Sequence, residues 1–184
     1  HQTVHSDKSD CFECILTQYP ESERLRAVSM VDRIGCNVLS CAARFGNMRS
    51  IELIIGLYPE AERLRAVTVI NPSGTTVLHS IAESHDFECL ETVLALLPES
   101  ERWQALSRTN GSGNTVLHLI AILTSIDNIK TVLSLYPTES QLLQALEIRN
   151  QEGQTVLDRM DRKTRSSIMQ WLSKSESSAL HLSQ

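Results

Sequence analysis

The segment ESERLRAV at residues 21–28 decides the fold, because the chain repeats it three more times. The later copies read EAERLRAV (60–67), ESERWQAL (99–106) and ESQLLQAL (139–146). The dipeptide Val-Leu recurs in phase with them, at 38–39, 77–78, 116–117 and 156–157. Two landmarks held together at steps of 39, 39 and 40 residues predict a repeat architecture.

Each period divides into a turn and three helices. Turn chemistry such as Asn110-Gly111-Ser112-Gly113 comes first, and a Thr or Asn then opens a short helix, expected over about 76–84 in the second period. A second helix follows with apolar residues at helical spacing. A third helix carries the recurrent proline in its first turn. One core layer is expected from four equivalent residues of this third helix: Leu25, Leu64, Trp103 and Leu143.

From Asp32 the chain reads DRIGCNVLSCAARFGN, followed by MRSIELII. This resembles the ankyrin repeat, and GTTVLHSIA (74–82) and GNTVLHLIA (113–121) keep its T-x-L-H core. The resemblance covers about residues 10–172. Val stands where the family has Pro in its T-P-L-H tetrapeptide. The period is longer than that of the family by the segment that follows this chain's recurrent proline. It implies an all-α, ankyrin-type helical repeat solenoid with an extra short helix per repeat.

The periods divide the chain into repeat units. Charged residues from Asp158 to Lys163 replace apolar ones in the last copy, as a capping repeat requires. We therefore expect a disordered segment (1–9), a partial N-terminal repeat (10–30), three full repeats (31–69, 70–108 and 109–148), a C-terminal capping repeat (149–172) and a tail (173–184).

Composition narrows the classes of partner. The 184 residues carry a net charge of −5 without a Lys/Arg run, which argues against nucleic acid or an anionic membrane as partner. No apolar run reaches the roughly 20 residues that span a bilayer. Five cysteines, an odd number, favour a reducing intracellular location. We expect a monomer without a cofactor.

Several chemical motifs have a simpler structural interpretation. His79 and His118 occupy equivalent repeat positions, where the ankyrin pattern gives His a structural role. His1, His5, Cys11 and Cys14 imitate a zinc spacing, but no second C-x-x-C exists. Cys41 or Cys89 would need a paired His to act as a nucleophile. A row of arginines can bind phosphate, but intrahelical ion pairs with the neighbouring glutamates are favoured for Arg24, Arg63 and Arg102.

The ankyrin resemblance also points to a recognition surface. It places the residue after the T-x-L-H His and the two residues before the Gly in a concave groove, where exposed apolar side chains mark interaction sites. Coverage by the extra helix or the tail is the competing interpretation. The expected partner-binding residues are Arg44, Phe45, Glu83, Leu119, Ile122 and Leu123, with Ile70, Arg108 and Arg149 at the rim.

These features predict a non-enzymatic protein–protein interaction module that binds a protein partner through this groove. The long, divergent repeats resemble those of effectors that intracellular bacteria secrete, which would make a host protein the partner and the host cytosol the location. The alternative is a recognition or regulatory arm of a larger enzyme, because the chain lacks an initial Met and begins in an incomplete repeat.

Overall fold

The described chain is helical. The structure is a computed structural model, and it describes residues 12–33, 36–71, 74–123 and 125–181, with side chains up to residue 174. Within these ranges the only β-type pairing is an isolated bridge between Val31 and Asn37. The predicted all-α class is confirmed. The segment 1–9, predicted to be disordered, lies outside the described residues.

After a short helix at 12–17, three kinds of helix alternate along the chain, and we call them first, second and third helices. The first helices are α3 (Val38–Arg44), α6 (Val77–Glu83), α9 (Val116–Leu123) and α12 (Val156–Arg159). The second helices are α4 (Met48–Gly56), α7 (Phe87–Ala95), α10 (Ile126–Ser134) and the beginning of α13 (Arg162–His181). The third helices are α2 (Glu21–Ser29), α5 (Glu60–Thr68), α8 (Glu99–Leu106) and α11 (Glu139–Glu147).

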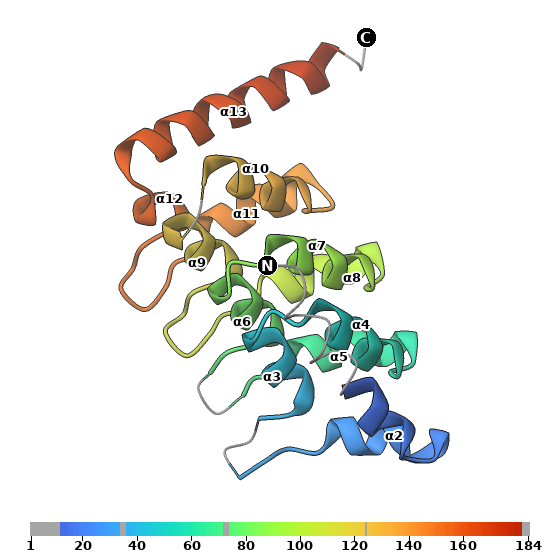
Figure 1. Ribbon diagram of the computed structural model, residues 1–184. Coiled ribbons are helices and arrows are strands. Elements are labelled where there is room, and N and C mark those ends of the chain that lie inside the picture. Colours follow the sequence, from blue (N-terminus) through green and yellow to red (C-terminus); the bar gives the residue numbers. More distant parts are fainter. Residues whose placement is uncertain (1–11, 34–35, 72–73, 124, 182–184) are drawn as a thin grey trace, which may run out of the picture.

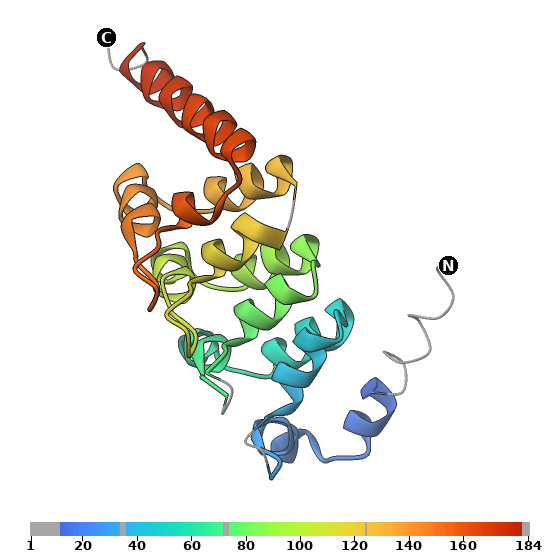
Figure 2. The ribbon, with the colours of Figure 1, turned by 90° about the vertical axis from the view of Figure 1, so that its left-hand side faces the viewer.

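Equivalent helices lie beside one another in chain order. Helix α3 contacts α6, α6 contacts α9, and α9 contacts α12. Figures 1 and 2 show the same progression for the whole molecule, from α2 at one end to α13 at the other. The extended loops that precede the first helices, here called finger loops, project together from one side. Each first helix therefore lies against the first helix that follows it in the chain.

The core lies between the first and second helices. The Val-Leu dipeptide supplies its deepest residues on the first helices, since Leu39, Leu78 and Leu117 are buried. The second helices face them with buried residues at the spacing i, i+3, i+4, which the helical period places on one side. These residues are Ile51, Ile54, Ile55, Leu90, Val93, Leu94, Ile129, Val132 and Leu133.

The first helices begin where the sequence predicted. Asn37 accepts a hydrogen bond from the Ser40 N–H at the start of α3. Thr76 is the N-cap of α6 and Ser84 its C-cap, so the helix with its two caps spans the predicted range of 76–84. In α12, Thr155 and Asp158 bond each other's backbone N–H groups as a capping box. Short polar side chains thus satisfy the free N–H groups of helix starts.

The finger loops also contact one another. Asn110 Oδ1 accepts the N–H groups of Ser112 and Asn114, which closes the turn. The next loop repeats this pattern around Asn150, whose Nδ2 donates to Asn114 Oδ1 at 3.0 Å. The Gln151 N–H donates to the Ser112 carbonyl at 3.1 Å. Backbone and side-chain hydrogen bonds therefore connect neighbouring units at this edge.

The third helices differ from the prediction at their first residue. Pro20, Pro59 and Pro98 stand at the N-cap, one residue before the helix, and not in its first turn. In this position the Pro20 carbonyl accepts the Glu23 N–H at 2.8 Å. In the last copy the inserted Thr138 takes the capping role, and its hydroxyl accepts the Gln141 N–H.

The expected core layer of Leu25, Leu64, Trp103 and Leu143 is wrong. The first three are only partly buried, and Leu143 is exposed. The buried layer lies three residues further on, at Val28, Val67, Leu106 and Leu146. Because both sets have the same helical spacing, the sequence pattern could not distinguish the face toward the core from its flank.

The C-terminal end of the chain is a long helix. Helix α12 has only four residues, and Asp161 Oδ1 then accepts the Lys163 and Thr164 N–H groups at the start of α13. The backbone of α13 continues through the predicted tail as far as His181. Figure 1 shows the second half of α13 extending beyond the other helices.

Candidate functional site

The C-terminal ends of three first helices form a continuous row of surface positions. Each helix ends with two residues that face outward in equivalent places, because α3, α6 and α9 contact one another in order. We call these residues the first-helix surface. They are Arg44 and Phe45 at the end of α3, Glu83 and Ser84 at the end of α6, and Ile122 and Leu123 at the end of α9.

Phe45 is the most exposed large apolar residue of this surface. Its side chain is 76% exposed, and it stands at the C-cap of α3. Ile122 is 50% exposed, and Leu123 is also exposed. These exposed fractions refer to the folded chain, in which the third helices and α13 are present. The described parts of the predicted cover therefore do not bury these residues. Exposed apolar side chains of this size favour contact with another molecule.

Helix α6 separates the two apolar ends of the surface. Neighbouring helix axes lie roughly 8–10 Å apart, so Phe45 and Ile122 are about two helix spacings from each other. The residues between them are Glu83 and Ser84. Leu119 is only partly exposed, because it also packs against the core. The expectation of Leu119 as a fully exposed groove residue is therefore wrong, and the apolar surface has a polar centre.

Phe45 borders a hollow of about 410 Å³, which we call the Phe45 hollow. The 12–17 helix, α3 and the beginning of α4 form its walls. Ser50 in the wall is buried, and its Oγ has no hydrogen-bond partner among the described residues. Its remaining walls are mainly apolar. The lining residues are Phe12, Val38, Cys41, Ala42, Phe45, Asn47 and Ser50.

The thiol of Cys41 remains protonated at neutral pH. Partial burial raises its pKa above the ordinary value of 9.0, the nearby Cys36 and Asp32 raise it further, and only Arg44 opposes them. A protonated thiol is a poor nucleophile but a good apolar contact. Cys89 is buried, and burial raises its pKa to about 12. The Cys41 thiol therefore adds an uncharged contact to the Phe45 hollow.

The predicted rim residues lie on the arms of the finger loops, before the turns. Ile70 and Arg108 are exposed, and they follow α5 and α8. Arg149 donates from a terminal nitrogen to the Gly153 carbonyl at 2.6 Å, so part of its guanidinium holds its own loop. Arg149 also lines a second cavity, near α13, which the sequence did not indicate.

His79 and His118 have structural roles. His79 Nδ1 accepts from the Thr76 backbone N–H, and its Nε2 therefore donates to the Asn114 carbonyl at 2.8 Å. His118 contacts Thr115 and the Gln154 carbonyl in the same way. Burial lowers the pKa of both imidazoles, which keeps them neutral at pH 7. Each histidine thus joins its own helix start to the next finger loop.

The recurrent arginines bind backbone carbonyls. Arg24 and Arg63 donate through Nε to the Tyr19 and Tyr58 carbonyls, and Arg102 donates through Nε to the Leu94 carbonyl. The expectation of intrahelical ion pairs with neighbouring glutamates does not describe these contacts. The arginines satisfy the free carbonyl groups where each second helix ends.

The described residues show neither a metal-binding cluster nor a membrane-spanning helix. The described residues contain no group of three or more His, Cys, Asp or Glu side chains that could hold a metal ion. His1, His5 and Cys11, which the zinc spacing requires, lie outside the described part of the chain. Among the described residues, no helix combines the length and apolar character that crossing a bilayer requires.

Comparisons with protein-family models and with curated proteins found no match to this chain.

Proposed function

We propose that the chain is an ankyrin-type helical solenoid that binds a protein partner through the first-helix surface. The order of contacts among equivalent helices supports the solenoid, because each unit contacts the units next to it in the sequence. The hydrogen bonds of His79 and His118 to the following loops support it independently.

The exposure of Phe45 beside an apolar hollow carries the proposal of binding. A large aromatic side chain, 76% exposed, loses unfavourable contact with water when a partner covers it. The hollow next to it offers space for an apolar side chain of the partner. An aromatic anchor next to a pocket can provide a large share of the binding energy in protein complexes.

The polar centre of the surface gives the partner a second requirement. Arg44, next to Phe45, and Glu83, on the helix between Phe45 and Ile122, lie at equivalent positions of adjacent helices and carry opposite charges. A matching partner carries apolar groups at both ends and polar or charged groups between them. Charges at such a position select partners and orient them more than they add affinity. The resemblance to secreted effectors makes host-cell proteins the first partners to test.

Affinity capture with surface variants tests the proposal. Wild-type protein and the double variant Phe45→Glu, Ile122→Glu are immobilised in equal amounts, after circular dichroism has shown equal helix content. Tyr19→Glu serves as the matched control, because Tyr19 is an exposed aromatic residue outside the first-helix surface. We expect the double variant to lose the proteins that wild type and the control retain. Equal capture by all three would reject the surface.

A further inference from the structure

The Phe45 hollow opens on one face of α3. Its lining residues on this helix have the spacing i, i+3, i+4, i+7, which places their side chains on one side. They are Val38, Cys41, Ala42 and Phe45. The equivalents of the first three in α6 are Val77, Ser80 and Ile81, which are all buried. Helix α6 has α3 before it, whereas no first helix precedes α3 within the described ranges, and its open face is available to another molecule.

One polar atom in the wall of the hollow lacks a partner. Ser50 is only 3% exposed, and its Oγ forms no hydrogen bond with any described residue. Its backbone N–H donates to Asn47 Oδ1 at 3.2 Å, so the start of α4 is held without the hydroxyl. A buried hydroxyl without a partner costs free energy, which a ligand that reaches it recovers. Serine can both donate a hydrogen bond to such a ligand and accept one from it.

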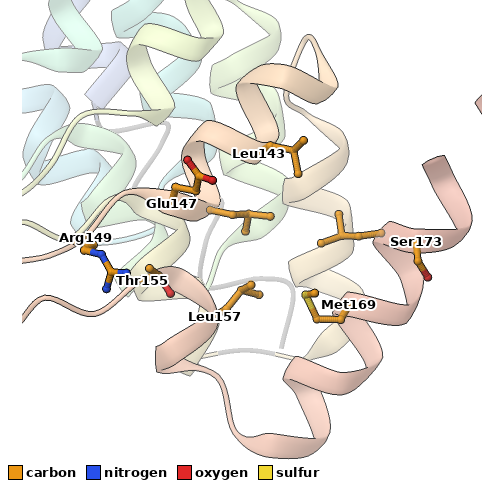
Figure 3. A pocket seen from close by; sticks show the side chains of 9 residues that line it. Leu143, Glu147, Arg149, Thr155, Leu157, Met169 and Ser173 are labelled. Atoms are coloured by element: carbon orange, nitrogen blue, oxygen red, sulfur yellow. The ribbon is translucent and has the colours of Figure 1, made fainter.

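The cavity near α13, which Arg149 lines, has no comparable group. Figure 3 shows the charged side chains of Glu147 and Arg149 together with the apolar Leu143 and Met169 in its walls. In the described chain, none of the buried polar atoms that lack a partner belongs to a residue that lines this cavity. The unpaired hydroxyl therefore distinguishes the Phe45 hollow, because it sets a chemical requirement for the occupant.

The walls of the Phe45 hollow favour a neutral aromatic occupant. None of its lining residues is Asp, Glu, Lys or Arg, so a charged group would lose hydration there without gaining a counter-charge. Phe12 and Phe45 offer two aromatic rings, and contacts between aromatic rings add stability beyond the area that they bury. A volume of about 410 Å³ falls in the range of ligand pockets, roughly 300–1,000 Å³, and accommodates a ring.

We propose that the Phe45 hollow binds a tyrosine side chain of the protein partner, with the ring between Phe12 and Phe45 and the phenol hydroxyl bonded to Ser50 Oγ. The inference rests on the proposed function, because the partner supplies the tyrosine. A phenylalanine or leucine would leave the Ser50 hydroxyl unpaired, and a serine or threonine would not cover the aromatic walls. Tyrosine combines an apolar ring with one polar end, and this combination enriches it at protein interfaces.

Binding of p-cresol, the side-chain analogue of tyrosine, tests the site without the partner. NMR titration of the backbone amides of α3 and α4 gives the dissociation constants of p-cresol and of toluene, the analogue of phenylalanine. We expect Ser50→Ala to weaken p-cresol binding about fivefold, because one hydrogen bond is lost. Toluene should bind this variant at least as tightly as wild type, since alanine leaves no hydroxyl unpaired.

Ser40→Ala is the matched control, because Ser40 lies on α3 but does not line the hollow. It should leave the dissociation constants of both probes unchanged. Equal p-cresol affinity in wild type and Ser50→Ala would overturn the proposal. An equal loss of both probes in Ser50→Ala would also overturn it, because Ser50 would then shape the hollow without bonding the phenol. The same conclusion would follow if p-cresol shifted no amide of α3 or α4.

A captured partner distinguishes this inference from the proposed function. If the double variant Phe45→Glu, Ile122→Glu loses the partner, Ser50→Ala should bind it about fivefold more weakly than wild type. Unchanged partner affinity in Ser50→Ala would then reject the tyrosine and leave the first-helix surface valid. Capture by the double variant would reject the surface itself. Self-association of wild type that p-cresol reverses would assign the hollow to the exposed Tyr19 of a second copy, and would overturn the proposal.

Discussion

His79 donates its Nε2 proton to the backbone carbonyl of Asn114 at 2.8 Å, and thereby joins α6 to the finger loop of the following unit. The same carbonyl accepts the Asn110 N–H that closes this loop. One buried side chain therefore holds a helix start, through Thr76, and a neighbouring turn at the same time. In α12 this position is Asp158, which keeps the bonds to Thr155.

Replacing His79 should destabilise the chain by more than the loss of its side-chain volume alone would. His79→Ala leaves the Thr76 N–H without its partner and opens a cavity at a fully buried site. We expect the free energy of unfolding to fall by about 2–4 kcal/mol. Urea unfolding measures the change, with His85→Ala as the control, because His85 is exposed. Equal stabilities of the two variants would contradict the bridging role.

The two buried histidines should also make stability depend on pH. Burial lowers their pKa in the folded state below 6.5, so below this pH the unfolded chain binds more protons. Stability should therefore be constant above pH about 6.5 and fall toward pH about 5. The double variant His79→Gln, His118→Gln should flatten this part of the curve, as urea unfolding at several pH values would show. An unchanged slope would mean that other groups cause the loss.

A pair of glycines tests the contact between finger loops. Gly113 and Gly153 have φ angles of +76° and +74°, so alanine costs similar backbone strain at both. A Cβ atom at Gly113 would lie 2.7 Å from the Gln151 backbone nitrogen, whereas a Cβ at Gly153 meets no atom within 4 Å. Gly153→Ala should cost about 1 kcal/mol and Gly113→Ala at least about 1 kcal/mol more. Thermal unfolding compares them, and equal losses would argue against stacked loops.

His85 carries backbone strain that glycine would remove. Its φ angle is +61°, and the equivalent Gly46 has +63°. The left-handed region disfavours residues with a Cβ, although glycine also gives the unfolded chain more freedom. We expect His85→Gly to stabilise the chain by about 0.5–1 kcal/mol and Gly46→Ala to destabilise it by about 1 kcal/mol. Chemical denaturation should give opposite signs for the two changes.

Cys41 should react slowly and interfere with binding once it has reacted. Its raised pKa leaves little thiolate at neutral pH, so the rate of alkylation by iodoacetamide should still be rising at pH 9.0. The attached group would occupy the Phe45 hollow and block the partner. Intact-mass spectrometry follows the reaction, and Cys41→Ser identifies the site. Full binding by alkylated protein would exclude the hollow from the interface.

The sequence predicted those features that depend on strong local signals. Thr76 and Asn37 cap helices as expected, because a short polar side chain directly before an apolar helical run typically accepts the free N–H groups of the helix start. The sequence pattern puts the prolines one residue too far into the third helices, since N-cap and first-turn positions both tolerate a missing N–H. The sequence pattern does not distinguish the buried layer at Val28 from the flanking one at Leu25, because both recur with the same period.

The surface was less predictable than the helices. The row from Phe45 to Leu123 follows from repeat register alone, and the structure places these residues at equivalent helix ends. Leu119 is half-buried because it packs against the core, and no local sequence pattern records this contact. The cavity near α13, which Arg149 lines, also has no local sequence signal, because its lining residues come from α11, α12 and α13 together.

Site-specific photocrosslinking locates the interface most directly. The photoreactive residue p-benzoylphenylalanine replaces Phe45, Ile122 or the control Tyr19, and the variant proteins are irradiated with a captured partner. The account predicts covalent adducts with the partner from positions 45 and 122 and none from position 19. Adducts from position 19 alone, or equal yields from all three, would contradict binding through the first-helix surface.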